Sequence, residues 1–304
     1  SGCTQVQDPA GGEAVAQKTI RISGAFALYP MMITWSEEYH KIHPEVNFEI
    51  SAGGAGKGMT DALTGMVDIG MVSRDISAAE VARGARYVAV AKDAVVGTYN
   101  ARNPAVPAVS RRGLTPSELR QIFVNRSITD WSAISGSPGT PAPVHVYTRS
   151  DACGASDVWS KFLGNYTQDD LRGTGVYGDP GIVEALKGDT AGIGYNNINF
   201  AYDMVSGRPV AGIAIVPLDR NGDGTIDTGE DFYGTREDLI RAISEKKYPS
   251  PPARELYLAT RGAFSGETRE FVRWILTDGQ NLTASAGYLP VDPAVAQKEL
   301  NAIG

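Results

Sequence analysis

The sequence predicts an α/β fold with largely parallel sheets, and three observations support this prediction. Short apolar segments that fit strands alternate with segments that fit helices from residue 18 onward. A nearly continuous apolar run at 67–72 suits a strand that is buried on both faces. The chain has 304 residues, which is long for one hydrophobic core and sufficient for two lobes.

The first part of the chain alternates strand and helix. Strands are expected where apolar residues alternate or run together, at 20–22, 46–50 and 67–72. A helix is expected at 31–40, because Pro30 stands where the first helical position favours proline, and a shorter one at 59–64. The segment 77–80 reads Ser-Ala-Ala-Glu, a capping box that starts another helix.

A second region begins near Thr98 and continues the alternation. Thr115, Pro116 and Glu118 mark a helix start through a cap, a first-position proline and a capping-box glutamate. Further strands are expected at 143–148 and 191–195. Further helices are expected at 154–163, at 179–188, after Thr235, and as a longer element at 267–284.

Composition and charge argue against several classes of partner. The net charge is −7, which disfavours nucleic acid and anionic membrane surfaces. The chain contains no apolar stretch of about 18 residues, so we expect no transmembrane helix in it. The composition is that of an ordinary globular protein, and any anion site must be a local positive feature in it. We also expect a monomer.

The first residues fit the end of a lipoprotein leader. Ser1 and Gly2 place two small residues before Cys3, and residues 1–17 are small and polar. We expect a flexible tether here, with Cys3 as the lipidated residue of an extracytoplasmic protein in the periplasm or on the cell surface. The alternative is an ordinary cysteine behind two added residues.

Three turns rich in small residues each follow a predicted strand and open a predicted helix, at 24–30, 53–56 and 152–156. The first amides of a helix lack intrahelical partners and carry the positive end of the helix dipole. Small residues let an anion approach this backbone closely. A single such turn is common in α/β proteins, but three converging turns would hold an oxyanion.

Together these segments resemble the phosphate-binding proteins of bacterial and archaeal ABC transporters. The resemblance covers residues 18 to 291 and rests on six elements in the same order, at 24–30, 52–56, 67–73, 149–155, 190–195 and 288–291. It implies a two-lobe, hinged periplasmic-binding-protein-like fold with two crossovers. It also implies a transport function and no enzymatic one: capture of inorganic phosphate, or a related oxyanion, for the membrane subunits of an ABC transporter.

The resemblance further implies a division of the chain and a set of ligands. Residues 18–97 and 205–304 would form lobe 1 and residues 98–204 lobe 2, with the anion in the cleft between them. The implied anion-binding residues are Leu28, Tyr29, Gly53, Gly54, Ser73, Arg74, Arg149, Cys153, Gly154 and Ala155. Asp151 would orient the Arg149 guanidinium, which offers a planar fork to two anion oxygens.

The chain departs from the family pattern at several ligands. Gly53, Cys153 and Ala155 stand where the family has hydroxyl side chains, and Ser73 replaces the aspartate that accepts the proton of hydrogen phosphate. Backbone amides survive these replacements, so an oxyanion site is still expected, while a different anion remains an alternative. Asp75 could supply the missing acceptor. Arg74 could add a second cationic ligand or form an ordinary surface ion pair.

Residues 219–230 match an EF-hand-type calcium loop. The expected ligands are Asp219, Asn221, Asp223, Thr225 through its carbonyl, Asp227 and Glu230. Gly224 would supply the sharp turn at the sixth position. Because the flanks do not fit a pair of helices, we expect one structural calcium ion and no sensor function. The alternative is a solvated loop rich in Asp and Gly.

Two other functions fit parts of the sequence. Cys153 at a helix start could be a reactive thiol, with Asp151 and His145 near it in the sequence. A calcium-stabilised surface or adhesion module with a vestigial anion cleft would also fit the altered ligands. A thermal-shift screen against phosphate, sulfate, arsenate and molybdate would separate these functions.

Overall fold

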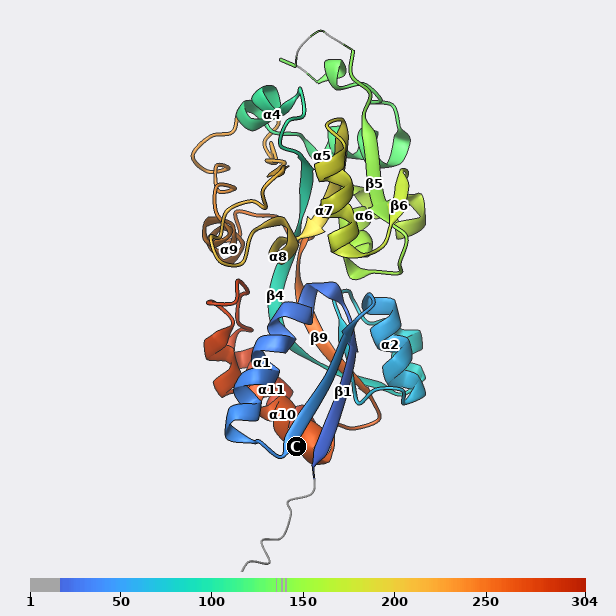
Figure 1. The fold of residues 1–304 in the computed structure, drawn as a ribbon, viewed down its shortest axis with the longest axis vertical. Coiled ribbons are helices and arrows are strands. Elements are labelled where there is room, and N and C mark those ends of the chain that lie inside the picture. The colour runs from blue at the N-terminus through green and yellow to red at the C-terminus, as the bar shows by residue number, and fades with distance from the viewer. Residues whose placement is uncertain (1–16, 135, 138, 140) are drawn as a thin grey trace, which may run out of the picture.

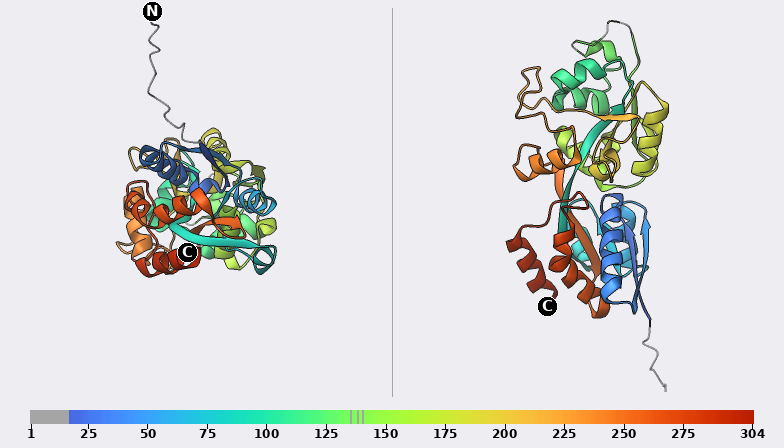
Figure 2. Two further views of the ribbon diagram at one scale, coloured as in Figure 1. Left: turned by 90° about the horizontal axis from the view of Figure 1, so that it is seen from below. Right: turned by 60° about the vertical axis from the view of Figure 1, so that its left-hand side comes forward.

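The computed structural model describes residues 17–134, 136–137, 139 and 141–304. Two lobes lie one above the other, and the long strands β4 (Ala85–Asn100) and β9 (Ala253–Arg261) run along the region where they join (Figures 1 and 2). No helix in the described ranges combines the length and the apolar character needed to cross a bilayer. Cys3 and the predicted tether, apart from Gln17, lie outside the described residues.

The first lobe contains a mixed sheet. Strand β1 (Lys18–Gly24) lies between β2 (Val46–Ala52) and β3 (Ile69–Val72), and both pairings are parallel. Strand β3 then pairs antiparallel with β9, and β9 with the first half of β4. The helices of this lobe are α1 (Tyr29–Ile42), α2 (Ala55–Thr64), α3 (Ala78–Ala82), α10 (Gly266–Leu276) and α11 (Pro293–Ile303).

The second lobe continues the sheet from the other half of β4. Strand β7 (Gly192–Asn197) pairs antiparallel with β4, and β5 (His145–Arg149) lies parallel to both β7 and β6 (Thr174–Val176). Strand β8 (Ile213–Ile215) pairs with the end of β4. The helices are α4 (Val106–Arg112), α5 (Pro116–Arg120), α6 (Gly154–Gly164), α7 (Gly178–Gly188), α8 (Ile198–Ala201) and α9 (Arg236–Ser244).

The predicted α/β architecture and both capping boxes are confirmed, but the sheet is mixed instead of largely parallel, because β3 pairs antiparallel with β9, and β4 with β7, β8 and β9. Ser77 and Thr115 accept the expected backbone N–H groups of Glu80 and Glu118. The expected helix at 267–284 is wrong, because α10 ends at Leu276 and a short 3-10 turn, η5 (Asp278–Leu282), follows. Trp35 Nε1 donates to Gly279 O at 2.9 Å, which holds this break against α1.

The hydrophobic residues form two main cores, and these correct the predicted lobe boundaries. The first core takes residues from 20–91 and 256–288, and the second takes residues from 94–253. Val216, Leu239 and Tyr248 therefore belong to the second lobe, although residues 205–252 were expected in the first. Tyr248 OH donates to Val95 O on β4 at 2.6 Å, and β8 pairs with the same strand. The second crossover thus lies at the start of β9.

Candidate functional site

The three predicted turns meet where the lobes touch. The first two turns belong to the first lobe and the third to the second. The Gly56 N–H donates to Ala152 O at 3.1 Å across this contact. A Cβ on Gly154 would lie only 2.2 Å from Ser73 O and 2.3 Å from Ser73 Oγ. The predicted convergence is therefore present, and it is tight enough to require glycine at position 154.

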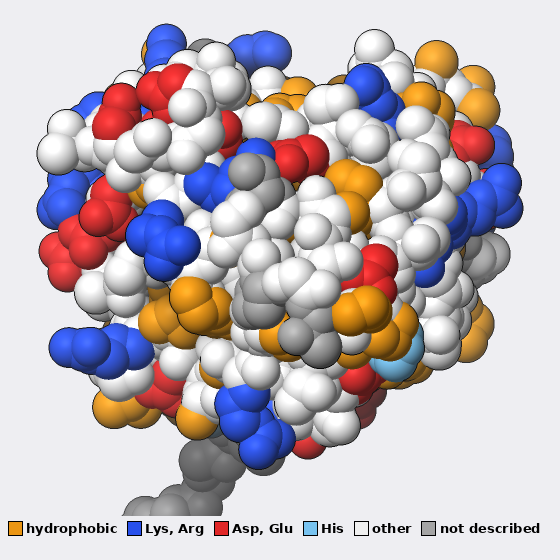
Figure 3. Space-filling view, turned by 90° about the horizontal axis from the view of Figure 1, so that it is seen from above, with side chains coloured by type: hydrophobic (Ala, Val, Ile, Leu, Met, Phe, Trp, Pro, Cys, Tyr) orange, Lys and Arg blue, Asp and Glu red, His pale blue; other side chains and the backbone are white. Residues whose placement is uncertain are grey.

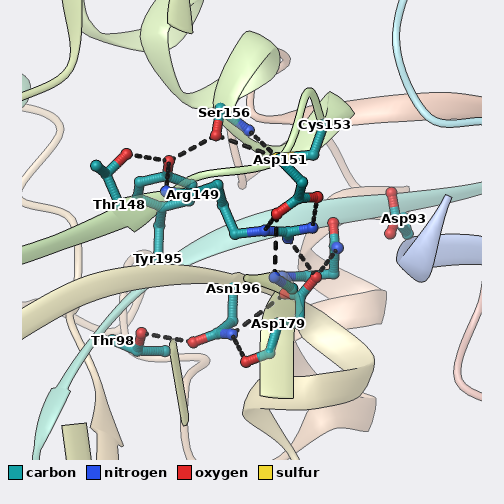
Figure 4. A network of polar contacts seen from close by, with 12 residues as sticks. Asp93, Thr98, Thr148, Arg149, Asp151, Cys153, Ser156, Asp179, Tyr195 and Asn196 are labelled. Atoms are coloured by element: carbon teal, nitrogen blue, oxygen red, sulfur yellow. Dashed lines mark hydrogen bonds and ion pairs between the residues drawn. The ribbon is translucent and has the colours of Figure 1, made fainter. Parts of the chain in front are cut away.

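Arg149 ends β5 at this contact, and two carboxylates hold its guanidinium (Figure 4). Nε donates to Asp151 Oδ1 at 2.8 Å, Nη2 to Asp151 Oδ2, and Nη1 to Asp179 Oδ2 at 2.7 Å. A guanidinium has five N–H groups, and within the described residues three of them make these bonds. Each Nη nitrogen thus keeps a second N–H for a ligand.

The environment of Arg149 keeps its side chain charged. The residue is only 4% exposed. Burial opposes the cation, but the carboxylates of Asp179 and Asp151 more than offset this and raise the pKa of Arg149. Its guanidinium carbon lies 5.2 Å from the ring centroid of Phe26, which comes from the first lobe. Arg149 therefore lies between groups of both lobes.

Asp179 is a site residue that the sequence analysis missed. It is fully buried in the first turn of α7 and accepts from Arg149, from the Asn197 backbone N–H at 2.8 Å, and from the side chains of Asn196 and Asn197. In the sequence, Asp179 is only an acidic residue before a proline at the start of a helix. Many helices on a protein surface begin in this way, so the pattern does not identify a site residue. Its role depends on β5 and β7 lying beside α7.

The polar network continues from the site to the strands that join the lobes. Asn197 Oδ1 accepts from Arg254 Nη2, and Arg254 Nε donates to Asp93 Oδ1 at 2.8 Å. Asp93 lies on β4 and Arg254 on β9. Burial raises the pKa of Asp93, although the neighbouring Arg254 opposes this. Buried polar groups therefore connect the Arg149 region with both crossovers.

Tyr195 ties the end of β5 to the start of α6. Its hydroxyl lies 2.7 Å from both Thr148 Oγ1 and Ser156 Oγ, and it accepts the Arg149 backbone N–H at 3.3 Å. These contacts fix the backbone on either side of the third turn. The resemblance placed Tyr195 in a shared element, but only the structure shows that it supports Arg149.

Several predicted amide ligands already donate within the protein, which corrects their expected role. Leu28 N–H donates to Ala25 O and Tyr29 N–H to Phe26 O, inside a 3-10 turn. The amides of Gly53 and Gly54 both donate to Gly24 O, and that of Cys153 donates to Gln168 Oε1 at 3.2 Å. Gly154 and Ala155 supply the first amides of α6, where intrahelical acceptors are lacking. Of the predicted donors, these amides, Arg149 and the Ser73 hydroxyl still fit an anion site.

Arg74 is not placed as an anion ligand. Its two Nη atoms donate to the Glu80 carboxylate at 2.7 and 3.0 Å, within the first lobe. Asp75, the suggested proton acceptor, has an 82% exposed side chain and pairs with Lys161 of α6 at 3.1 Å. The structure therefore shows the alternative, in which this segment forms surface ion pairs.

The surroundings of Cys153 argue against a catalytic thiol. The residue is 6% exposed, and its Sγ lies 3.1 Å from Ser156 Oγ. Burial raises the pKa of the thiol, although the nearby Arg149 opposes this. His145 Nδ1 lies 2.7 Å from Asp189 Oδ2 at the opposite end of β5, so it is engaged away from the thiol.

We expect Cys153 to resist alkylation in the folded protein. In a Cys3→Ser variant, iodoacetamide at pH 8 should leave the Cys153 thiol largely unmodified, because burial hinders access and disfavours the thiolate. The same variant should react fully in denaturant, as measured by mass spectrometry. Modification of the folded protein as fast as of the denatured one would contradict this prediction and revive the reactive-thiol alternative.

The predicted calcium loop lies apart from Arg149, between β8 and α9 of the second lobe. In the described part of the chain, no three side chains of His, Cys, Asp or Glu are gathered closely enough to hold a metal ion as they stand.

Comparison with known proteins places this architecture in a family. Residues 9–279 match the PBP superfamily domain. The chain belongs to the PBP superfamily. This PBP superfamily protein is 26% identical over 298 residues to protein SphX of Synechococcus elongatus, an alignment that covers 93% of this chain and 81% of the relative. It is 25% identical over 302 residues to the phosphate-binding protein PstS of Bacillus subtilis. This alignment covers 97% of this chain and 88% of the relative.

Solved structures show the same two-lobe fold. The PBP superfamily chain matches an ABC-type phosphate transport receptor from Vibrio cholerae with a TM-score of 0.61 and 19% identity, over 89% of this chain and 99% of that one. It also matches a Clostridium perfringens structure, assigned as a phosphate ABC transporter substrate-binding protein with bound phosphate, with a TM-score of 0.72 and 23% identity, over 90% and 100%. At these identities the likeness establishes the fold.

Proposed function

We propose that this protein is an extracytoplasmic solute-binding protein that captures inorganic phosphate, or a related tetrahedral oxyanion, for the membrane subunits of an ABC transporter. The observation that carries the proposal is Arg149, a buried cation with N–H groups to spare at the contact between the lobes. Its relatives in the PBP superfamily include proteins named for phosphate binding. Capture and delivery require no bond to be made or broken, which agrees with the absence of an enzymatic role in our proposal.

In this proposal the lobes close on the anion by bending at β4 and β9. The contacts from Gly56 to Ala152 and from Gly154 to Ser73 would form on closure. The buried groups from Arg149 through Asp179 and Asn197 to Arg254 would keep the site aligned with the hinge. Exclusion of water strengthens the attraction between the anion and Arg149, because the effective dielectric constant falls.

The carboxylates of the site bear on the identity of the anion. Two buried aspartates surround one arginine, so the site presents acceptors as well as donors. Asp151 Oδ2 lies 2.9 Å from the position that a Cβ on Gly54 would occupy, so it faces the first lobe. We propose that this oxygen accepts the proton of hydrogen phosphate, in place of the family aspartate at position 73. Sulfate carries no proton to donate and would leave this carboxylate opposed to an anion oxygen.

Isothermal titration calorimetry with four anions tests the proposal. We expect phosphate and arsenate to bind, and sulfate and molybdate to bind at least about a hundredfold more weakly, because an anion without an O–H would place an oxygen against the Asp151 carboxylate with no proton between them. Equal affinities for sulfate and phosphate would contradict the role of Asp151 and leave a general oxyanion site. No heat with any of the four anions would contradict the proposed function itself.

The proposed location rests on Cys3 and on the transport role. Detergent extraction from the native host followed by intact-mass measurement should show a diacylglycerol-modified Cys3, and an unmodified cysteine would remove the anchor from the proposal.

Figure 3 shows the outer end of the second lobe, where Lys and Arg side chains are interspersed with Asp and Glu. This mixed face, together with the net charge of −7 of the whole chain, supports our proposal that nucleic acid is not a partner.

A further inference from the structure

The loop at residues 219–230 is anchored to the second lobe at two of its residues. Asp219 N–H donates to Leu114 O at 3.1 Å, and Ile226 N–H donates to Arg111 O at 2.8 Å. Ile226 Cδ1 would lie 2.7 Å from a Cβ on Gly113, so its side chain packs directly on the segment that follows α4. The loop is thus held against one segment of the lobe at its first and eighth positions.

The first and last side chains of the loop are buried carboxylates. Asp219 is 1% exposed and Glu230 is 6% exposed. Glu230 Oε1 accepts the Arg220 backbone N–H at 2.8 Å, which brings the end of the loop back to its start beside Asp219. Glu230 Oε2 is buried and, within the described residues, has no hydrogen-bond partner. A buried carboxylate oxygen without a partner is costly, so this oxygen requires a ligand that the protein does not supply.

Among the residues that the structure describes, Asp219 and Glu230 form no ion pair with a cationic side chain. Arg220 is their neighbour in sequence, but its Nη1 donates to Lys247 O. Arg241 and Lys247 of the same lobe pair with Asp238 and Glu245 instead. In the described ranges, the ion pairs include none of the four loop carboxylates, at positions 219, 223, 227 and 230. Their negative charge is therefore available to a cation from solution.

The donor set selects the class of cation. Carboxylate, amide and carbonyl oxygens suit a hard cation, and calcium accepts six to eight such ligands in a flexible geometry, whereas magnesium requires a near-ideal octahedron. Gly224 has φ +78 at the sixth position, where this type of loop turns sharply. The outer side chains are exposed and bond to the backbone: Asn221 Oδ1 and Asp223 Oδ1 accept amides at 2.9 Å each. To ligate an ion they would turn inward and exchange these local bonds for contacts to the metal.

We propose that residues 219–230 bind one calcium ion, with buried Asp219 and Glu230 as the preset ligands. Asp223, Asp227, the Asn221 amide and the Thr225 carbonyl complete the shell when the ion enters. The loop lies between Leu218 and the segment 231–233, and these flanks are joined because Leu218 N–H donates to Tyr233 OH at 3.1 Å. Calcium thus clamps this segment to the second lobe. It stabilises the lobe without contacting the Arg149 site.

Thermal unfolding of the chelator-treated full-length protein tests this inference. If 5 mM calcium is about a hundredfold excess over the dissociation constant, its addition should raise Tm by roughly 5 °C. The same concentration of magnesium should raise Tm by clearly less. Calorimetry with calcium alone should give one site. Phosphate affinity should be the same with calcium and with chelator, so failure of the calcium site and failure of the proposed function are distinguishable.

Three variants identify the ligands. Glu230→Gln keeps the shape but loses the charge at the unpartnered oxygen, and it should weaken calcium binding at least about tenfold. Asp227→Asn should also weaken calcium binding, and because Asp227 is exposed, this change should leave the fold intact. Glu237→Gln, an exposed glutamate of α9, is the matched control and should bind calcium normally. An unchanged Tm together with no calorimetric heat at millimolar calcium would overturn the proposal, as would wild-type calcium affinity in both ligand variants.

Discussion

Replacing Arg149 with alanine should abolish phosphate binding and lower the free energy of unfolding by about 3–5 kcal/mol. The substitution removes the only site cation in our proposal and leaves the buried carboxylates of Asp151 and Asp179 without their partner. An unpaired buried charge is more costly than the pair was favourable. Calorimetry with phosphate and urea unfolding of the same preparation would measure both effects.

Two further variants make this test specific. Arg149→Lys keeps a positive charge but cannot serve Asp151 and Asp179 as a planar fork, so it should recover part of the stability and little of the affinity. Arg74→Ala is the matched control, because Arg74 pairs with Glu80 in the first lobe. It should leave phosphate affinity unchanged. Wild-type affinity in Arg149→Ala, or lost affinity in Arg74→Ala, would show that the site is assigned to the wrong arginine.

Gly154→Ala should impair closure of the lobes while leaving each lobe folded. The added Cβ would lie 2.2 Å from Ser73 O across the contact. The φ of Gly154 is not among the positive values, so alanine fits the local backbone of α6. Overpacking of this kind costs about 1–3 kcal/mol, which corresponds to a roughly ten- to hundredfold loss of phosphate affinity if closure is required.

Small-angle scattering and calorimetry would measure the effect of this substitution. Wild-type protein should become more compact when phosphate is added, and Gly154→Ala should do so only at much higher phosphate concentration. Gly188→Ala is the control, because a Cβ at Gly188 meets open space. If Gly154→Ala bound phosphate as tightly as the control, the contact between Gly154 and Ser73 would not be part of the bound state.

Local features account for most of what could be predicted. The capping boxes at Ser77 and Thr115 are formed by residues three positions apart, and both are present. Asp151 lies two residues after Arg149, and the predicted pair is also present. The amide ligands were predicted less well, because a glycine turn shows where a backbone is accessible but not which carbonyl will accept its N–H. Gly24 O takes the amides of both Gly53 and Gly54.

By itself, the sequence determined the alternation of strands and helices, the three small-residue turns, Arg149 with its adjacent Asp151, and the calcium-loop pattern. These depend on neighbours within a few residues, where propensity, capping and spacing act. Only the tertiary structure decided that Asp179 completes the arginine site from 30 residues away, that Arg74 turns to Glu80, and that 205–252 packs in the second lobe. Those outcomes depend on which surfaces the packing of the two cores brings together, and similar local patterns are compatible with several such packings.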